Sequence, residues 1–202
     1  MCGRYDLSEN PASVKAKFAV PSVPDFRPSL DVRPTELNPI IRLNRARDAR
    51  ECALARWGLV PSWAKDLSFG TRCINARAES LATASAFRGA YEARRCLVPA
   101  SAFYEWSGPK GKRIKWRVVL KDEPLFALAG LWEWWKDRDR DDPPVHSYTI
   151  VTTDANAALV HIHDRMPVIL APKDYARWLD AKQDVTDLMT PYPEEHVRFT
   201  SE

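Results

Sequence analysis

The 202-residue chain has no long apolar run, since no stretch approaches the roughly 18–20 residues that cross a bilayer as a helix. Its opening residues, Met-Cys-Gly-Arg-Tyr-Asp, have no apolar core of the kind found in secretion signals. The sequence also has no G-x-G-x-x-G, P-loop or H-E-x-x-H motif, which argues against nucleotide-binding folds and zincins. We therefore expect a folded cytoplasmic protein without a membrane segment.

Cysteines are few, and the net charge is small. The four cysteines contain no C-x-x-C pair, which argues against a zinc knuckle and a disulfide framework. We expect Cys52, Cys73 and Cys96 to be small core residues. A net charge of +3 does not indicate a nucleic-acid binder. However, arginines number 20 against 10 lysines, and there are eight tryptophans. Guanidinium groups and aromatic faces suit phosphates and unpaired bases.

Local patterns predict mostly strands with a few helices. Asn10-Pro11 is typical of a helix start, and the following Val14 and Phe18 share one helical face. Residues 21–39 contain five prolines and are expected to be extended and irregular. Strands are predicted at 113–120, 125–132 and 147–153, a solvated hairpin loop at 136–142, and helices at 85–94, just after 154, and at 173–180.

The spacing of these elements predicts the fold class. The strands have hairpin-like spacing, and few helices lie between them to make parallel crossovers. This organisation is typical of an α+β fold built on a mixed, mostly antiparallel sheet. There is no internal repeat and no linker, so we expect a single domain over residues 1–202.

Cys2 is a candidate nucleophile because of its position. Aminopeptidases remove Met1 when the second side chain is small, which would leave Cys2 with an α-amine and a thiol on one carbon. The α-amine has a reference pKa of about 8, against about 10.4 for lysine, so far more of it is neutral at pH 7. It could form a Schiff base with an aldehyde, and the nearby thiol could then close a thiazolidine ring. Any residue can occupy position 2, so Cys2 alone does not establish this chemistry.

Other segments carry residues suited to acid–base chemistry or phosphate binding. In Phe103-Tyr104-Glu105-Trp106, strand alternation places Glu105 on the face of Phe103, so it is either an edge residue or a buried acid with a raised pKa. His163 could transfer a proton near neutral pH. With only one alternating histidine pair and no third ligand evident, we expect no metal site.

Five segments, in this order, resemble the motifs of the SOS-response-associated peptidase (SRAP) family. The resemblance runs from Cys2 to about Pro193. The segments are Cys2-Gly-Arg-Tyr5, Trp57-Gly-Leu-Val-Pro-Ser-Trp63, Ile74-Asn-Ala-Arg-Ala-Glu79, Cys96-Leu-Val-Pro-Ala-Ser-Ala-Phe-Tyr-Glu-Trp106 and Ile162-His-Asp-Arg-Met-Pro167.

The resemblance implies a barrel-like sheet core flanked by a few helices, and a protein that cross-links to abasic sites in single-stranded DNA. It implies no cofactor, and we expect a monomer that associates with the nucleoid when it binds DNA. It assigns roles residue by residue. Cys2 would be the nucleophile, Asn75 would orient the opened sugar, Glu105 would be the acid–base and His163 a proton donor. DNA contacts would come from Arg4, Pro34, Trp63, Arg77, Trp106 and Arg165.

The chain departs from the family pattern in the expected DNA channel. It has Ala64 where a second aromatic is common, and Asp31-Val-Arg-Pro34 where Asn-x-Ala-Pro is common. Two alternative functions also remain open. An amidohydrolase or peptidase would use the Cys2 thiolate and require an oxyanion hole. A non-covalent single-strand binder would depend on salt and not on Cys2.

Overall fold

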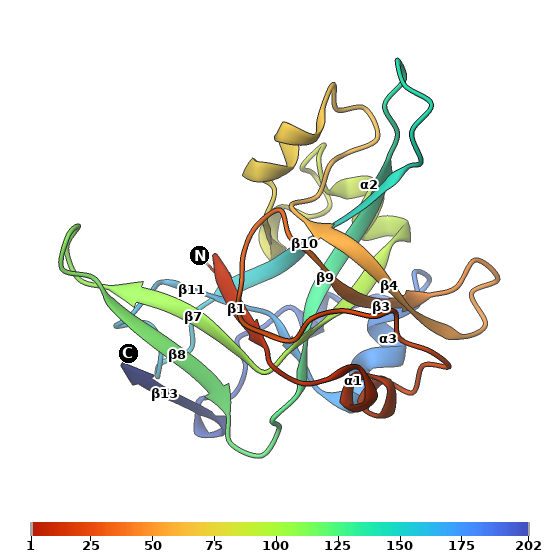
Figure 1. Ribbon diagram of the computed structural model, residues 1–202. Coiled ribbons are helices and arrows are strands. Elements are labelled where there is room, and N and C mark those ends of the chain that lie inside the picture. The colour runs from red at the N-terminus through yellow and green to blue at the C-terminus, as the bar shows by residue number, and fades with distance from the viewer. Residues whose placement is uncertain (1, 202) are drawn as a thin grey trace.

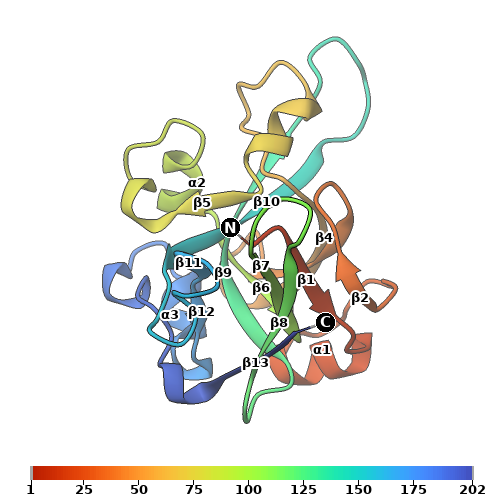
Figure 2. The same ribbon diagram turned by 90° about the vertical axis from the view of Figure 1, so that its left-hand side faces the viewer.

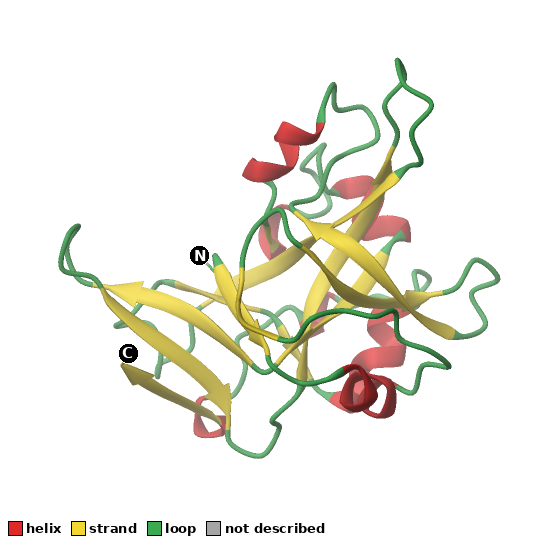
Figure 3. Ribbon diagram, in the orientation of Figure 1, coloured by secondary structure: helices red, strands yellow, loops and turns green. Residues whose placement is uncertain are grey.

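The computed structural model describes residues 2–201. Strands dominate, and short helices lie at the periphery (Figure 3). The α-helices are α1 (Pro11–Phe18), α2 (Arg88–Ala93) and α3 (Tyr175–Leu179). The 3-10 helices are η1 (Leu67–Arg72), η2 (Ala78–Ser80), η3 (Pro172–Asp174), η4 (Thr186–Leu188) and η5 (Glu194–His196). Within residues 2–201, no helix is long and apolar enough to cross a membrane.

Five strands close into a barrel. They are β3 (Leu37–Leu43), β4 (Arg50–Trp57), β6 (Arg95–Ala100), β9 (Phe126–Trp135) and β10 (Val145–Asp154). The ring follows the order β10-β4-β3-β6-β9 and closes through the β9–β10 pairing. Only the β10–β4 contact in this ring is parallel. The expected α+β class, with a mixed and barrel-like sheet, is confirmed.

The long strand β10 extends beyond the ring. Its first half pairs with β4 and β9, whereas its second half pairs with β5 (Asn75–Arg77) and β11 (Arg165–Pro167). The two-residue strand β12 (Ile169–Leu170) pairs with β9. β10 therefore connects the barrel to the segments that carry Asn75 and His163.

A second sheet lies beside the barrel. Its order is β13-β8-β7-β1-β2, and all its pairings are antiparallel. The strands are β1 (Arg4–Leu7), β2 (Ser29–Val32), β7 (Ala102–Ser107), β8 (Ile114–Leu120) and β13 (Val197–Ser201). β7, β8 and β13 extend to the left of the barrel (Figure 1). The amino-terminal strand β1 is thus an interior strand, between β7 and β2.

Buried aromatic side chains join the two sheets. Tyr5 of β1 shares a hydrogen bond of 2.7 Å with the Tyr148 hydroxyl of β10. The Trp57 ring packs edge-on against Tyr5, with centroids 5.2 Å apart, and stacks on Tyr148 at 6.4 Å. All three side chains are fully buried. This cluster fixes the start of the chain against the barrel.

Several local predictions are confirmed, and others are wrong. Helix α1 begins after Asn10, whose Oδ1 accepts the Ser13 amide at 2.9 Å. Residues 21–39 are not wholly irregular, because β2 and the start of β3 lie among prolines that flank β2 without interrupting it. The helix expected at 85–94 covers only 88–93, and the segment after Asp154 forms turns instead of a helix. Cys73 and Cys96 are buried as expected, while Cys52 is only partly buried.

Candidate active site

Cys2 lies at the junction of the two sheets. Its side chain is fully buried, just before β1, whose Arg4 is opposite Tyr104 in β7. Continuing this antiparallel register places Glu105, the next residue of β7, close to the residues that precede Arg4. Both ribbon views place the amino-terminal end beside β7, β10 and β11 (Figures 1 and 2). Strands of both sheets therefore surround the candidate nucleophile.

The Cys2 thiol is held in its protonated form. Burial raises its pKa well above the usual value, and the negative charge of Glu105 raises it further. The thiol donates a hydrogen bond to the Arg4 carbonyl oxygen, which is 3.6 Å from the sulfur. A thiol in this environment reacts as a nucleophile only if a base removes its proton.

Asn75 touches the Cys2 backbone directly. Its Nδ2 donates a 2.9 Å hydrogen bond to the Cys2 carbonyl oxygen, whereas its Oδ1 is buried and has no hydrogen-bond partner among residues 2–201. The preceding Ile74 carbonyl accepts the Trp57 indole N–H at 2.8 Å. Asn75 is therefore rigidly placed and retains a buried acceptor.

Glu105 is a buried acid, as the strand alternation allowed. Its side chain is on β7 and the residue is only 3% exposed. Burial raises its pKa to about 7, and the negative charge of Asp164 also contributes. A carboxyl group with this pKa can both accept and donate a proton near neutral pH.

His163 is half-buried in the segment before β11. Its Nδ1 accepts the Arg165 backbone N–H at 3.0 Å and is 2.9 Å from the Asp164 carboxylate. A single nitrogen cannot accept a hydrogen bond from the Arg165 N–H and donate one to the Asp164 carboxylate at the same time. Burial lowers the His163 pKa, which favours the neutral ring. A neutral ring that accepts the Arg165 amide carries its proton on Nε2.

Arg165 is buried and engaged within the protein. Its guanidinium donates to Glu79 at 2.8 and 3.0 Å, to Asp154 at 2.6 Å and to the Thr152 carbonyl at 2.7 Å. These bonds tie β11 to β10 and η2. We assign Arg165 to positioning the His163 segment, and a direct DNA contact by its side chain stays a prediction.

The other residues expected to contact DNA differ in exposure. Arg77 is exposed, and Trp63 is 51% exposed with its ring edge-on to Phe69. Trp106 and Pro34 are half-buried. Their contacts with DNA stay predictions.

Asp31 and Arg33, the two residues that depart from the Asn-x-Ala-Pro pattern of the family, have opposite charges and form an ion pair. The Asp31 carboxylate forms ion pairs with both Arg4 and Arg33. Although burial opposes the shift, the bonds from these two arginines lower the Asp31 pKa. A negative residue at 31 therefore comes with a positive residue at 33, and Arg4 has a carboxylate partner that the sequence motifs did not reveal.

The geometry also identifies supporting residues that the sequence did not. Trp57 orients Ile74-Asn75, and Asp164 acts on Glu105 and His163. Both residues lie inside the motifs of the SRAP family, and this position was the only sign in the sequence that they support the site. Within residues 2–201, no three His, Cys, Asp or Glu side chains are grouped to hold a metal ion.

These features define a class of protein with a buried cysteine at position 2, an amide bonded to its backbone, a buried acid of near-neutral pKa and a half-buried histidine. The chain belongs to the SRAP family: the model of that family, described as SOS response associated peptidase, matches residues 1–201.

Named relatives and solved structures agree with this membership. Abasic site processing protein YoqW of Bacillus subtilis is 39% identical over 201 residues, covering 95% of this chain and 88% of the relative. Abasic site processing protein HMCES of Pongo abelii is 29% identical, covering 98% and 70%. A crystal structure of a Bacteroides thetaiotaomicron protein superposes with a TM-score of 0.89 at 26% identity, covering 99% and 91%.

Proposed function

We propose that this protein processes abasic sites in single-stranded DNA by forming a covalent cross-link through Cys2 after Met1 is removed. The α-amine attacks the aldehyde carbon of the opened sugar, and loss of water gives an imine. The Cys2 sulfur then adds to the imine carbon, and its proton passes to the nitrogen. The product is a thiazolidine, which shields the lesion from strand cleavage.

The observation that carries this proposal is a buried Cys2 thiol with the buried Glu105 carboxyl close enough for its charge to act on that thiol. A thiol whose pKa is raised by burial requires a base to become nucleophilic. Glu105 has a pKa of about 7, so at neutral pH it can accept the thiol proton and return it to the ring nitrogen. The same proton transfers in reverse would open the ring.

Asn75 and His163 are suited to prepare the sugar. The closed sugar exposes no aldehyde, so its ring must open first. A neutral His163 with its proton on Nε2 can donate that proton to the ring oxygen. The buried Asn75 Oδ1, which has no partner among residues 2–201, can accept a hydroxyl hydrogen of the opened sugar.

We further propose that the DNA strand crosses the surface near Cys2. Arg4 and Arg77 would bind phosphates beside the lesion, and Trp63, Trp106 and Pro34 would face the bases. Arg77 and Trp63 are exposed enough to make such contacts without rearrangement. Arg4 would exchange part of its ion pair with Asp31 for a phosphate.

The test combines denaturing gel electrophoresis with intact mass spectrometry after the protein is mixed with single-stranded DNA carrying one abasic site. We expect a heat-stable adduct that lacks Met1 and is absent for Cys2→Ala. Cys2→Ser should give a weaker, less heat-stable adduct, because serine closes a less stable ring. An undiminished adduct from Cys2→Ala would refute the assignment.

The controls separate the alternatives. Cys73→Ala removes another buried cysteine and should leave the adduct unchanged. If protein without Met1 forms no adduct but hydrolyses amides, the amidohydrolase reading is correct. If it binds DNA only reversibly and Cys2→Ala binds equally well, the protein is a non-covalent single-strand binder.

A further inference from the structure

A pocket of about 490 Å³ lies in the barrel, apart from the residues of the candidate active site. It forms where β3 ends, β4 and β6 begin, and β9 ends, with the β3–β4 hairpin along one side. The pocket is at the first half of β10, where His146 pairs with Trp134, whereas Asn75 pairs at Ile150 in the second half. Figure 1 shows the β3–β4 hairpin on the far right, away from the amino terminus. None of the residues assigned above to the Cys2 site lines this pocket.

The pocket is strongly basic. Five arginines and one glutamate line it: Arg42, Arg45, Arg47, Arg94, Arg95 and Glu51. Arg42 pairs with Glu51 at 2.7 Å, and Arg94 pairs with Glu133 at 2.6 Å. Among residues 2–201, the other three arginines have no carboxylate within ion-pair distance, although Arg47 donates to the Ala93 carbonyl and Arg95 to the Asp180 and Gln183 carbonyls. The pocket therefore keeps an excess of positive charge.

Some of its guanidinium donors are buried without acceptors. Within the described part of the chain, Arg42 Nη1 and Arg94 Nε have no hydrogen-bond partner and are shielded from solvent. The Arg42 guanidinium stacks on the Trp132 ring, with its central carbon 4.1 Å from the ring centroid, so it is held in place. These two atoms lie out of reach of a ligand, but the Arg42 and Arg94 side chains keep 13% and 26% of their surface exposed, where a ligand in the pocket can contact them.

The pKa of His146 is also affected by the charged residues of this pocket. Its ring lies edge-on to Trp132, with centroids 5.7 Å apart. Burial lowers its pKa, and the charge of Arg42 lowers it further, although Glu51 acts in the opposite direction. The charge of Arg42 therefore adds to the effect of burial in disfavouring a second cation here.

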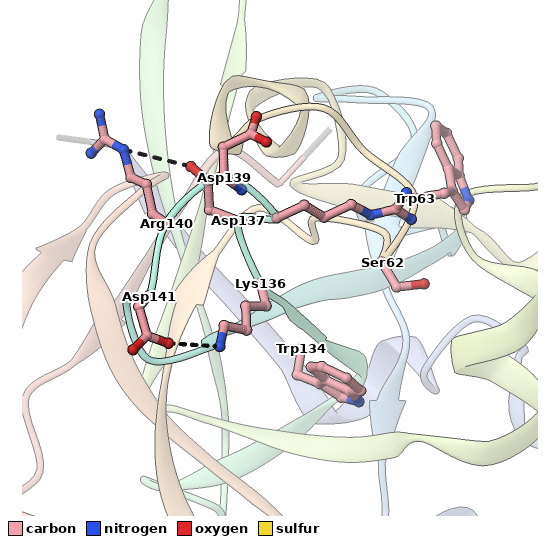
Figure 4. A pocket seen from close by; sticks show the side chains of 9 residues that line it. Ser62, Trp63, Trp134, Lys136, Asp137, Asp139, Arg140 and Asp141 are labelled. Atoms are coloured by element: carbon pink, nitrogen blue, oxygen red, sulfur yellow. Dashed lines mark hydrogen bonds and ion pairs between the residues drawn. The ribbon is translucent and has the colours of Figure 1, made fainter.

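The neighbouring pocket provides a contrast. It is lined by Trp63, Trp134 and the β9–β10 loop residues 136–141 (Figure 4). Its three aspartates balance its lysine and two arginines, and the loop pairs Lys136 with Asp141 and Arg140 with Asp137. Trp134 lines both pockets, so the basic pocket continues the surface that begins at Trp63.

We propose that the basic pocket is a second anion site, which binds a phosphate group. Guanidinium forks match phosphate oxygens in geometry and charge, and here several converge on one cavity. The phosphate could belong to the DNA backbone beyond the lesion or to a small phosphorylated molecule. The site does not depend on the Cys2 chemistry, because it shares no residue with it.

The test is calorimetric titration of the whole protein with inorganic pyrophosphate. Arg45→Glu reverses the charge of an exposed pocket arginine, and Arg198→Glu makes the same change on β13 in the other sheet. We expect saturable binding to the wild type, about tenfold weaker binding to Arg45→Glu, and unchanged binding to Arg198→Glu. Arg42→Lys keeps the charge but removes the fork, and should also weaken binding. Thermal unfolding of each variant verifies folding.

Undamaged single-stranded oligonucleotides then identify the source of the phosphate. If a long oligonucleotide displaces pyrophosphate and a short one does not, the ligand is the DNA backbone. If neither displaces it, the ligand is a small phosphorylated molecule. The proposal is wrong if pyrophosphate does not bind saturably, or if Arg45→Glu and Arg198→Glu weaken it equally. Cys2→Ala should bind pyrophosphate normally, so this result is independent of the cross-linking test.

Discussion

At the scale of single residues, Glu105 combines a chemical role with a cost in stability. Its folded-state pKa of about 7 lies above the ordinary value of 4.5. Between these two pH values the folded protein holds a proton that the unfolded chain releases. Stability is therefore expected to fall as the pH rises through this window, and the loss is complete above pH 7.

Glu105→Gln should remove this loss. The variant should resist unfolding better than the wild type at pH 8, by up to about 3 kcal/mol, and the two should converge near pH 4. Denaturant unfolding at several pH values measures the difference. The same variant should form the cross-link more slowly, and its rate should lose the inflection near pH 7. An unchanged pH–rate profile would remove Glu105 from the chemistry.

Arg77 is expected to contribute charge and no lesion recognition. Because its side chain is exposed on β5, Arg77→Ala should weaken binding to damaged and undamaged single strands alike. Loss of one phosphate contact should reduce the slope of log K against log salt by about 0.7. Fluorescence anisotropy at several salt concentrations tests this. A loss confined to abasic DNA would instead place Arg77 in the lesion pocket.

At the scale of elements, the segment from Gly58 to Trp63 is held closely against the barrel. The Gly58 amide donates to the Tyr148 carbonyl at 2.8 Å, and the Val60 amide donates to the Ser147 hydroxyl at 2.9 Å. Gly58 has a φ of +118°, and a Cβ there would lie 2.6 Å from the Gly70 carbonyl oxygen. The backbone path that presents Trp63 therefore requires glycine.

Gly58→Ala should destabilise the protein by about 1–3 kcal/mol through strain and steric overlap. It should also weaken single-strand binding, because η1 must move away and Trp63 moves with it. Gly111→Ala is the matched control, since Gly111 also has a positive φ but has nothing within 4 Å of the added Cβ. Unfolding midpoints compare the two variants. Equal destabilisation of the two variants would show that the close approach of Gly58 to Gly70 does not cause the loss of stability.

Elements with a clear local pattern were predictable from the sequence. The Asn-Pro start gave α1, and alternation gave β8, because these signals depend on neighbours in the chain. Strand β2 was missed because its four residues lie among prolines and are stabilised by pairing with the distant β1. The short helix α2 shows the usual limit at element ends, where tertiary packing outweighs propensity.

At the scale of the whole molecule, motifs identified residues but not their contacts. They indicated Cys2, Asn75, Glu105 and His163, yet no spacing predicts that an amide 73 residues away bonds to the Cys2 carbonyl. The parallel β4–β10 contact within the barrel is equally invisible in a local pattern. The internal pairing of Arg165 was unexpected because an arginine in a motif gives no sign of its burial.

The two sheets should unfold as one unit. The buried Tyr5–Trp57–Tyr148 cluster couples the two sheets, so neither should persist without the other. We expect tryptophan fluorescence and far-ultraviolet circular dichroism to give superimposable denaturant transitions. Two separate transitions would show that the sheets are independent domains.

The interior position of β1 has a consequence for the order of events during synthesis. Arg4 pairs with Tyr104, one hundred residues further along the chain. At about 5–20 residues per second, a ribosome takes roughly 5–20 seconds to make that segment. During this interval β1 can pair with β2 but not with β7, so one edge of the nascent amino-terminal strand is open and aminopeptidases can reach it. Because β7 emerges only after this interval, the proposed removal of Met1 would precede the burial of residue 2.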